Sequence, residues 1–256
     1  MTKTVLLAMT SHDKKGDTGQ STGAYLPEIA HPYAVFTKAG FTVEFASVRG
    51  GRVPLDGVDR ADPVNAAFLD NAELVRRLHE SAPSSAVDAS RYAAIFFAGG
   101  HGAMWDLPDD PSFARVAAAI YEAGGVVAAV CHGPAALVNV RLSNGTYLVA
   151  GKQVNGFTNE EERAAKLDLG FHRSQETGVL PRFRHEIPRT SSDRLDRQVD
   201  ASPSRHYNDR QQVIPGLNSA DQLQALVAGG RVTRVIEIND RHVELAAVQE
   251  DERLGA

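Results

Sequence analysis

The side chain with the clearest chemical potential in this sequence is that of its single cysteine, Cys131. It follows the apolar run 126–130, which is typical of a buried strand. Gly133 relieves crowding in the turn, and Pro134 suits the first turn of a helix, where no N–H donor is needed. A strand-to-helix turn of this kind projects its central side chain out of the sheet. The pattern predicts a nucleophile elbow with a reactive thiol; the alternative is a buried cysteine that packs as a small apolar side chain.

Other candidate site residues surround this turn. His132 adds a titratable group beside the sulfur, although a surface histidine without a role is the alternative. Gly99 and Gly100 close a second apolar run, where backbone without a Cβ can approach a ligand. The amides of Gly100 and His132 could together hold a developing oxyanion, although paired glycines also make an ordinary tight turn. His101 follows in the same loop, as a substrate-binding residue or as one that only shapes the loop.

Histidine and aromatic side chains near these loops are further candidates for a role in binding. His12, His101 and their acidic neighbours have no recognisable metal-ligand spacing, so no metal site is predicted. Phe97 and Trp105 are expected to be core or rim aromatics rather than groups that stack on a substrate.

Strand and helix patterns alternate through the first 170 residues. Buried strands are expected at 4–9, 42–47, 92–98 and 126–130, and helices at 28–39, 64–79 and 111–122. Parallel strands joined by helices form a doubly wound sheet whose ligand crevice lies beyond the carboxyl ends of the strands. Gly99, Gly100 and Cys131 all fall at such ends.

The use of basic residues changes after residue 170. The first 170 residues contain six lysines and nine arginines, whereas the remaining 86 contain no lysine and twelve arginines. One hypothesis is that this part of the gene is read in a shifted, GC-rich frame. Translation of the other two frames of the locus tests it, because the C-terminal pattern of the family named below should then emerge in one of them.

The change divides the chain into three predicted regions. Residues 1–170 form an α/β core, and residues 171–215 form an irregular or disordered insert that lacks periodicity. Residues 216–256 form an atypical C-terminal segment with a helix at 219–226 and a hairpin around Asn239 and Asp240.

Length and charge limit the class of protein. A chain of 256 residues suits one α/β domain with an appendage, and a net charge of −5 disfavours nucleic acid and anionic membranes as partners. No apolar run reaches membrane-spanning length, and the start of the chain lacks the features of a signal peptide, so a cytoplasmic location is expected. A single cysteine cannot form an internal disulfide, which agrees with a reducing compartment.

Several segments together resemble one family. The segments 22–28, 96–108, 124–137 and 151–162 are similar, in this order, to the ThiJ/PfpI family of the class I glutamine amidotransferase-like superfamily. Within that family they resemble the heat-shock chaperone and glutathione-independent glyoxalase (glyoxalase III) branch. The resemblance covers about residues 1–165, and the chain departs from the family pattern beyond residue 170.

The resemblance implies a flavodoxin-like three-layer α/β sandwich with a mostly parallel sheet, a homodimer and no organic cofactor. It also implies that Cys131, His132 and Glu28 are the catalytic residues. Without it, Glu28 is an ordinary first-turn carboxylate favoured by the helix dipole.

The expected activity is the conversion of methylglyoxal or glyoxal to lactate or glycolate. A Cys131 thiolate adds to the aldehyde to give a hemithioacetal, and Glu28 and His132 move protons through an enediol. A deglycase or chaperone activity of the same protein is part of this prediction. The alternatives are a cysteine hydrolase of the amidase or peptidase type, for which no distant His-x-Glu pair is evident, and a non-enzymatic holdase or redox sensor.

Overall fold

The computed structural model describes residues 3–150, 152, 235–238 and 243–246. A seven-stranded sheet forms its centre, built from β1 (Thr4–Met9), β3 (Thr42–Ser47), β5 (Ala82–Pro83), β6 (Ala94–Phe97), β7 (Val126–Val130), β8 (Val235–Ile238) and β9 (Val243–Ala246). The strand order is β5-β3-β1-β6-β7-β8-β9. The strands from β5 to β7 are parallel, whereas β8 pairs antiparallel with β7 and β9 antiparallel with β8.

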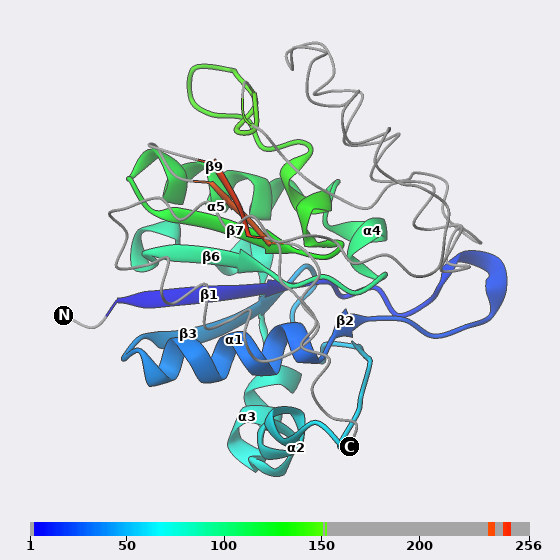
Figure 1. Ribbon diagram of the computed structural model, residues 1–256. Helices are drawn as coiled ribbons and strands as arrows, with labels where there is room; N and C mark the ends of the chain where they lie inside the picture. Colours follow the sequence, from blue (N-terminus) through cyan, green and yellow to red (C-terminus); the bar gives the residue numbers. More distant parts are fainter. Residues whose placement is uncertain (1–2, 151, 153–234, 239–242, 247–256) are drawn as a thin grey trace, which may run out of the picture.

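Helices cover both faces of this sheet (Figure 1). They are α1 (Pro27–Lys38), α2 (Pro63–Asp70), α3 (Ala72–His79), α4 (Ala103–Asp106) and α5 (Pro111–Glu122). Short 3-10 helices are η1 (Gly16–Thr18), η2 (Ser84–Ala86), η3 (Ala89–Arg91) and η4 (Gly133–Leu137). A separate parallel pair joins β2 (Ala24–Tyr25) to β4 (Leu55–Asp56), close to the start of α1.

Two hydrophobic clusters lie on the opposite faces of the sheet. On β1, Leu6 and Ala8 belong to the cluster that contains the buried side of α5, whereas Leu7 and Met9 belong to the cluster of α1, α2 and α3. Successive side chains of a strand point to opposite faces, and a parallel sheet covered on both sides needs apolar residues in both directions. The continuous apolar strand runs of the sequence therefore fix a three-layer arrangement.

The predicted flavodoxin-like α/β fold is confirmed. The strands predicted at 4–9 and 42–47 match β1 and β3, and the helix predicted at 111–122 matches α5. The strand predicted at 92–98 is shorter, as β6, and the helix predicted at 28–39 is α1. β1, β6 and β7 all end on the side of α4 and β2 (Figure 1), so Gly99 and Cys131 lie at one edge of the sheet.

The single helix predicted at 64–79 is wrong, because the structure divides this segment into α2 and α3 at Asn71. The Asn71 backbone is extended, with φ −86° and ψ 98°, and its side chain accepts hydrogen bonds from the amides of Glu73 and Leu74. An asparagine cap satisfies the free N–H groups of a helix start. Asn71 therefore ends one helix and begins the next, a cap that apolar periodicity alone does not reveal.

The helix predicted after the cysteine is a short 3-10 helix, η4, rather than an α-helix. Such helices are common as short connectors.

In the C-terminal segment, the described strands β8 and β9 pair antiparallel on either side of Asn239 and Asp240, where a hairpin was predicted, and they extend the main sheet beyond β7. The region 171–215 and the helix predicted at 219–226 lie outside the described residues.

Candidate active site

The elbow at the end of β7 holds Cys131 in an unusual backbone conformation. Its φ is 57°, the one positive φ of a residue other than glycine in the described part of the chain. This left-handed conformation costs on the order of 1–2 kcal/mol for a residue with a Cβ, and such strain concentrates at functional sites. The residue as a whole is of intermediate exposure, although burial of the thiol is the largest cause of its raised pKa. The strained turn thus presents the thiol at the edge of the sheet.

Glu28 reaches this turn from the first turn of α1. The start of the helix is tied to the β2–β4 pair, where the Leu26 amide donates to the carbonyl of Asp56 at 2.9 Å. Glu28 is 2% exposed, and its Oε2 accepts the amide N–H of Gly99 at 2.7 Å. Its carboxyl group also hydrogen bonds with Cys131. The structure therefore brings an acid from the N-terminal part of the chain onto the sulfur.

Burial sets the charge state of this pair. Desolvation raises the pKa of Glu28 from 4.5 to about 7, against the hydrogen bonds from Gly99 and Cys131, which lower it. Desolvation and the charge of ionised Glu28 raise the pKa of the Cys131 thiol well above its ordinary value. A standing thiolate beside an ionised Glu28 is therefore disfavoured, which corrects the expectation of an anionic sulfur. Two buried negative charges in contact repel each other, so ionisation of either group disfavours ionisation of the other.

Two backbone amides point at the sulfur. Hydrogen bonds from the amides of Gly100 and His132 stabilise the ionised form of Cys131 and act against the rise of its pKa. Gly99, predicted from the sequence as a position where backbone approaches a ligand, donates its amide N–H to Glu28. A Cβ on Gly99 would lie 2.7 Å from the His132 amide nitrogen and 2.8 Å from Glu28 Oε2. The acid and the elbow can therefore meet only across a residue without a side chain.

His132 turns toward the cysteine rather than away from it. Its Nδ1 lies 3.2 Å from Cys131 Sγ, and the residue is 2% exposed. Adjacent side chains meet only where the chain turns sharply, and the positive φ of Cys131 supplies that turn. His101 packs on the same ring, with 4.4 Å between the ring centroids and 43° between the planes. The interpretation of His132 as a surface histidine is wrong.

The other candidate residues lie around this centre. Trp105 stacks on His12, with 5.0 Å between the centroids and 4° between the planes, and Phe97 is buried against Phe113. Among the described residues no group of three or more histidine, cysteine or acidic side chains is placed to hold a metal ion. Of the motif at 151–162, only Lys152 is described.

Sequence reasoning missed the side chains that fasten the surrounding loops. Asp106 in α4 accepts hydrogen bonds from the Thr10 hydroxyl at 2.6 Å and from the Ser11 amide at 2.7 Å, and burial raises its pKa. His31, one turn after Glu28, bonds to Asp62 at 2.7 Å. Each pair is distant in sequence, so the only available signal was a set of polar residues within otherwise apolar segments.

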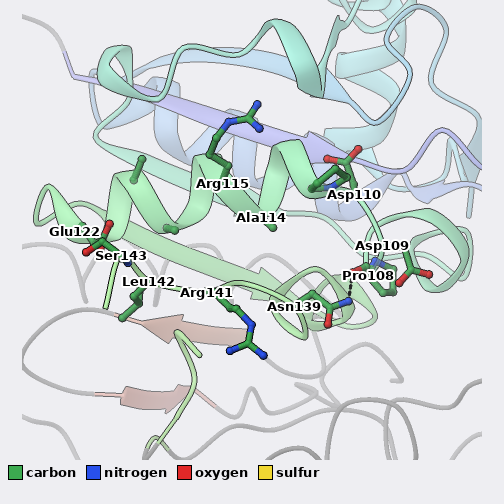
Figure 2. Close-up of a pocket in the computed structure, with 13 residues that line it drawn as sticks. Pro108, Asp109, Asp110, Ala114, Arg115, Glu122, Asn139, Arg141, Leu142 and Ser143 are labelled. Atoms are coloured by element: carbon green, nitrogen blue, oxygen red, sulfur yellow. Dashed lines mark hydrogen bonds between the residues drawn. The ribbon is translucent and has the colours of Figure 1, made fainter. Parts of the chain in front are cut away.

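A groove of about 550 Å³ lies elsewhere, between α5 and residues 139–143. Figure 2 shows Arg115 of α5 and Arg141 of the facing loop at its sides, with the Asn139 side chain bonded to the Pro108 carbonyl at 2.7 Å. None of the predicted site residues lines this groove. Its position does not connect it with the chemistry of Cys131.

The elbow, the buried acid and the parallel sheet agree with a known family. The model of the DJ-1/PfpI family matches residues 22–166. This chain belongs to the DJ-1/PfpI family. The family model thus spans the elbow, Glu28 and the Gly99 loop. Separately, no helix among the described residues is long and apolar enough to cross a membrane.

Named relatives within the family are similar over most of their length. The chain is 35% identical over 167 residues to "Glyoxalase 3" of Candida albicans, covering 60% of this chain and 68% of that protein. It is 34% identical over 177 residues to "Glutathione-independent glyoxalase HSP31" of Saccharomyces cerevisiae, covering 65% and 73%. The crystal structure of glyoxalase III from Candida albicans aligns with a TM-score of 0.63 at 30% identity, covering 71% of this chain and 80% of that one.

Proposed function

We propose that this protein is a glutathione-independent glyoxalase that converts methylglyoxal or glyoxal to lactate or glycolate. The observation that carries the proposal is the hydrogen-bonded pair of Cys131 and Glu28, in which burial raises the pKa of the acid to about 7. A group with this pKa can both release and accept a proton near neutral pH. The glyoxalase names of the relatives support the same chemistry.

The first step is the addition of the sulfur to the aldehyde. The proton of the Cys131 thiol moves to the Glu28 carboxylate, and the thiolate forms a C–S bond to the aldehyde carbon. Glu28 then returns this proton to the aldehyde oxygen, which gives a hemithioacetal and leaves Glu28 ionised. The amides of Gly100 and His132 stabilise negative charge on the sulfur and then on the oxygen beside it.

The second step moves hydrogen from one carbon to the next. Ionised Glu28 removes the proton from the carbon bonded to sulfur while the neighbouring carbonyl oxygen gains a proton from His132, which gives an enediol. Glu28 then returns its proton to the neighbouring carbon, and His132 takes back the hydroxyl proton on the carbon bonded to sulfur, which leaves a thioester. His132, whose Nδ1 lies 3.2 Å from the sulfur, is the group that exchanges protons with the oxygen atoms of the substrate. One carbon is oxidised and its neighbour reduced, so no external oxidant is needed. Water then cleaves the thioester, which releases the hydroxy acid and restores the thiol.

Gly99 and His101 are proposed to support the site through their neighbours. Gly99 holds Glu28 by its amide, and His101 contacts the His132 ring. This differs from the direct oxyanion or substrate contact expected for Gly99 and His101 from the sequence.

The test is lactate formation from methylglyoxal by the purified full chain without glutathione. The wild-type protein should form lactate, and both Cys131→Ala and Glu28→Gln should lose at least about 100-fold in rate. Glu80→Gln, a change of an exposed glutamate in an ion pair on the surface, is the matched control and should keep the wild-type rate. Methylglyoxal consumption by Cys131→Ala at the wild-type rate would refute the mechanism.

A homodimer, a cytoplasmic location and chaperone or deglycase activity are also proposed, on the family resemblance alone. Sedimentation equilibrium of the purified chain tests the dimer. Suppression of aggregation of a denatured client by the wild-type protein tests chaperone activity, and the same measurement with Cys131→Ala tests whether it is independent of the thiol. A monomer, or no protection of the client, would remove the corresponding proposal.

A further inference from the structure

We propose that His31 and Asp62 form a positioning pair, which holds the first turn of α1 so that the Glu28 carboxyl stays at the Cys131 sulfur. The kinetic consequence of the pair rests on the proposed function. Its effect on the reactivity of the sulfur is measured without turnover, so the two proposals can fail separately.

The helix itself holds the turn that carries Glu28 only weakly. The N-cap residue of α1, Leu26, has an apolar side chain that cannot accept a hydrogen bond. Pro32 lies inside the helix, four residues after Glu28, and a proline has no N–H. The hydrogen bond that an α-helix normally makes to the carbonyl of Glu28 is therefore missing. Because the first turn lacks this link to the second, its position depends on contacts from outside α1.

Two hydrogen bonds from the loop before α2 supply such contacts. The Leu26 amide donates to the Asp56 carbonyl at 2.9 Å, just before the helix begins. One turn later, Nε2 of His31 lies 2.7 Å from Oδ2 of Asp62. His31 follows Glu28 by three residues, so both side chains project from the same side of α1, and both are buried. The pair thus fastens the helix at the turn of Glu28 itself.

Asp62 is a rigid anchor, because both of its carboxylate oxygens are used. As the N-cap of α2, Oδ1 accepts the amides of Val64 at 2.8 Å and Asn65 at 3.2 Å, which leaves Oδ2 for His31. Desolvation is the largest influence on this carboxyl and would raise its pKa, but the hydrogen bonds from His31 and the two amides together lower the pKa from 3.8. An ionised carboxylate only accepts, so Nε2 of His31 is the donor of a charge-assisted hydrogen bond.

Release of the first turn would act on the sulfur through Glu28. The Glu28 carboxyl bonds to Cys131 and accepts the Gly99 amide at 2.7 Å, and Nδ1 of His132 contacts the same sulfur at 3.2 Å. Desolvation and the charge of Glu28 raise the pKa of the thiol. A Glu28 that moves away or becomes hydrated therefore lets the thiolate form at lower pH. The thiol ionises more easily, while the acid needed for proton transfer is out of place.

Alkylation of the single cysteine by iodoacetamide, followed against pH with the full chain, tests the pair. His31→Phe fills the space of the imidazole without a donor, and Asp62→Ser keeps a cap acceptor for α2 but is too short to reach His31. Each change should lower the midpoint pH of alkylation by at least about 0.5 unit and lower kcat for methylglyoxal about tenfold with KM almost unchanged. His31→Gln should stay near the wild type, because its amide can donate from nearly the position of Nε2.

Two surface changes are the matched controls. His79→Phe alters an exposed histidine at the end of α3, and Asp88→Ser alters an exposed cap of η3; both should match the wild type. Two double variants separate positioning from a general loss of structure. In a Glu28→Gln background, His31→Phe should shift the midpoint by less than about 0.2 unit, because the pair acts through Glu28. His31→Phe combined with Asp62→Ser should match either single change, because each already breaks the same contact.

A wild-type alkylation profile in both His31→Phe and Asp62→Ser overturns the positioning role. So does an undiminished shift in the Glu28→Gln background, or a combined variant whose shift exceeds that of either single change, since the two side chains would then act separately. If the wild type makes no lactate, the glyoxalase proposal fails, while the alkylation profiles still decide the role of the pair. If His31→Phe does not fold, Asp62→Ser, alone and with Glu28→Gln, decides by the same criteria.

Discussion

Glu28→Gln should change how the stability of the protein depends on pH. The unfolded chain releases the Glu28 proton near pH 4.5, whereas the folded protein holds it until about pH 7. Between these values the folded state binds more protons than the unfolded state, so the free energy of unfolding falls as the pH rises. At 1.36 kcal/mol per pH unit, ionisation of this buried carboxyl costs roughly 3 kcal/mol above pH 7.

Glutamine has nearly the same shape and can still accept the Gly99 amide, but it cannot ionise. Relative to the wild type, Glu28→Gln should therefore gain about 3 kcal/mol in unfolding free energy between about pH 4.5 and about pH 8. Urea unfolding at these two pH values, followed by the fluorescence of the single tryptophan, Trp105 in α4, measures the difference.

The control is Glu80→Gln, a change of a surface carboxylate paired with Arg76, which should shift by less than about 1 kcal/mol. A difference between wild type and Glu28→Gln that does not vary with pH would refute the argument that burial controls this carboxyl. A difference that varies in the opposite direction would show that the ionised form is the favoured one in the folded state.

Three further predictions concern the frame around the site. Gly99→Ala places a Cβ 2.8 Å from Glu28 Oε2 and should destabilise the protein by about 1–3 kcal/mol while slowing alkylation of the cysteine; unchanged unfolding and alkylation would contradict it. Asp62→Ala removes both the cap of α2 and the partner of His31 and should cost about 1–2 kcal/mol in urea unfolding, whereas Asp62→Asn should cost less because it retains a cap acceptor; equal losses would argue against the cap. Phe113→Ala should cost about 3–5 kcal/mol, since the ring is fully buried against the sheet, and a thermal midpoint near that of the wild type would exclude it from the core.

The sequence predicted well those elements whose signal is local. β1, β3 and α5 follow from apolar runs, helical spacing and punctuation by glycine and proline, and the structure has them within the predicted ranges. The division at Asn71 was missed because a cap within a continuous helical pattern depends on one side chain. The pairing of β8 with β7 could not be predicted, because strands that pair across a long stretch of chain leave no local pattern in the sequence.

The candidate site likewise combines features that are local in the sequence with features that depend on tertiary packing. Its reactive atom was evident from the sequence alone, since a glycine- and proline-bounded turn after a buried strand is a local pattern around Cys131. Glu28 was assigned by family resemblance, and only the packed chain brings it from α1 through Gly99 to the sulfur. The pKa of about 7 belongs to that arrangement as well, because desolvation depends on everything that surrounds a group and not on its neighbours in the chain. The sequence alone thus identified the reacting atom, whereas tertiary packing decided its protonation and the orientation of His132.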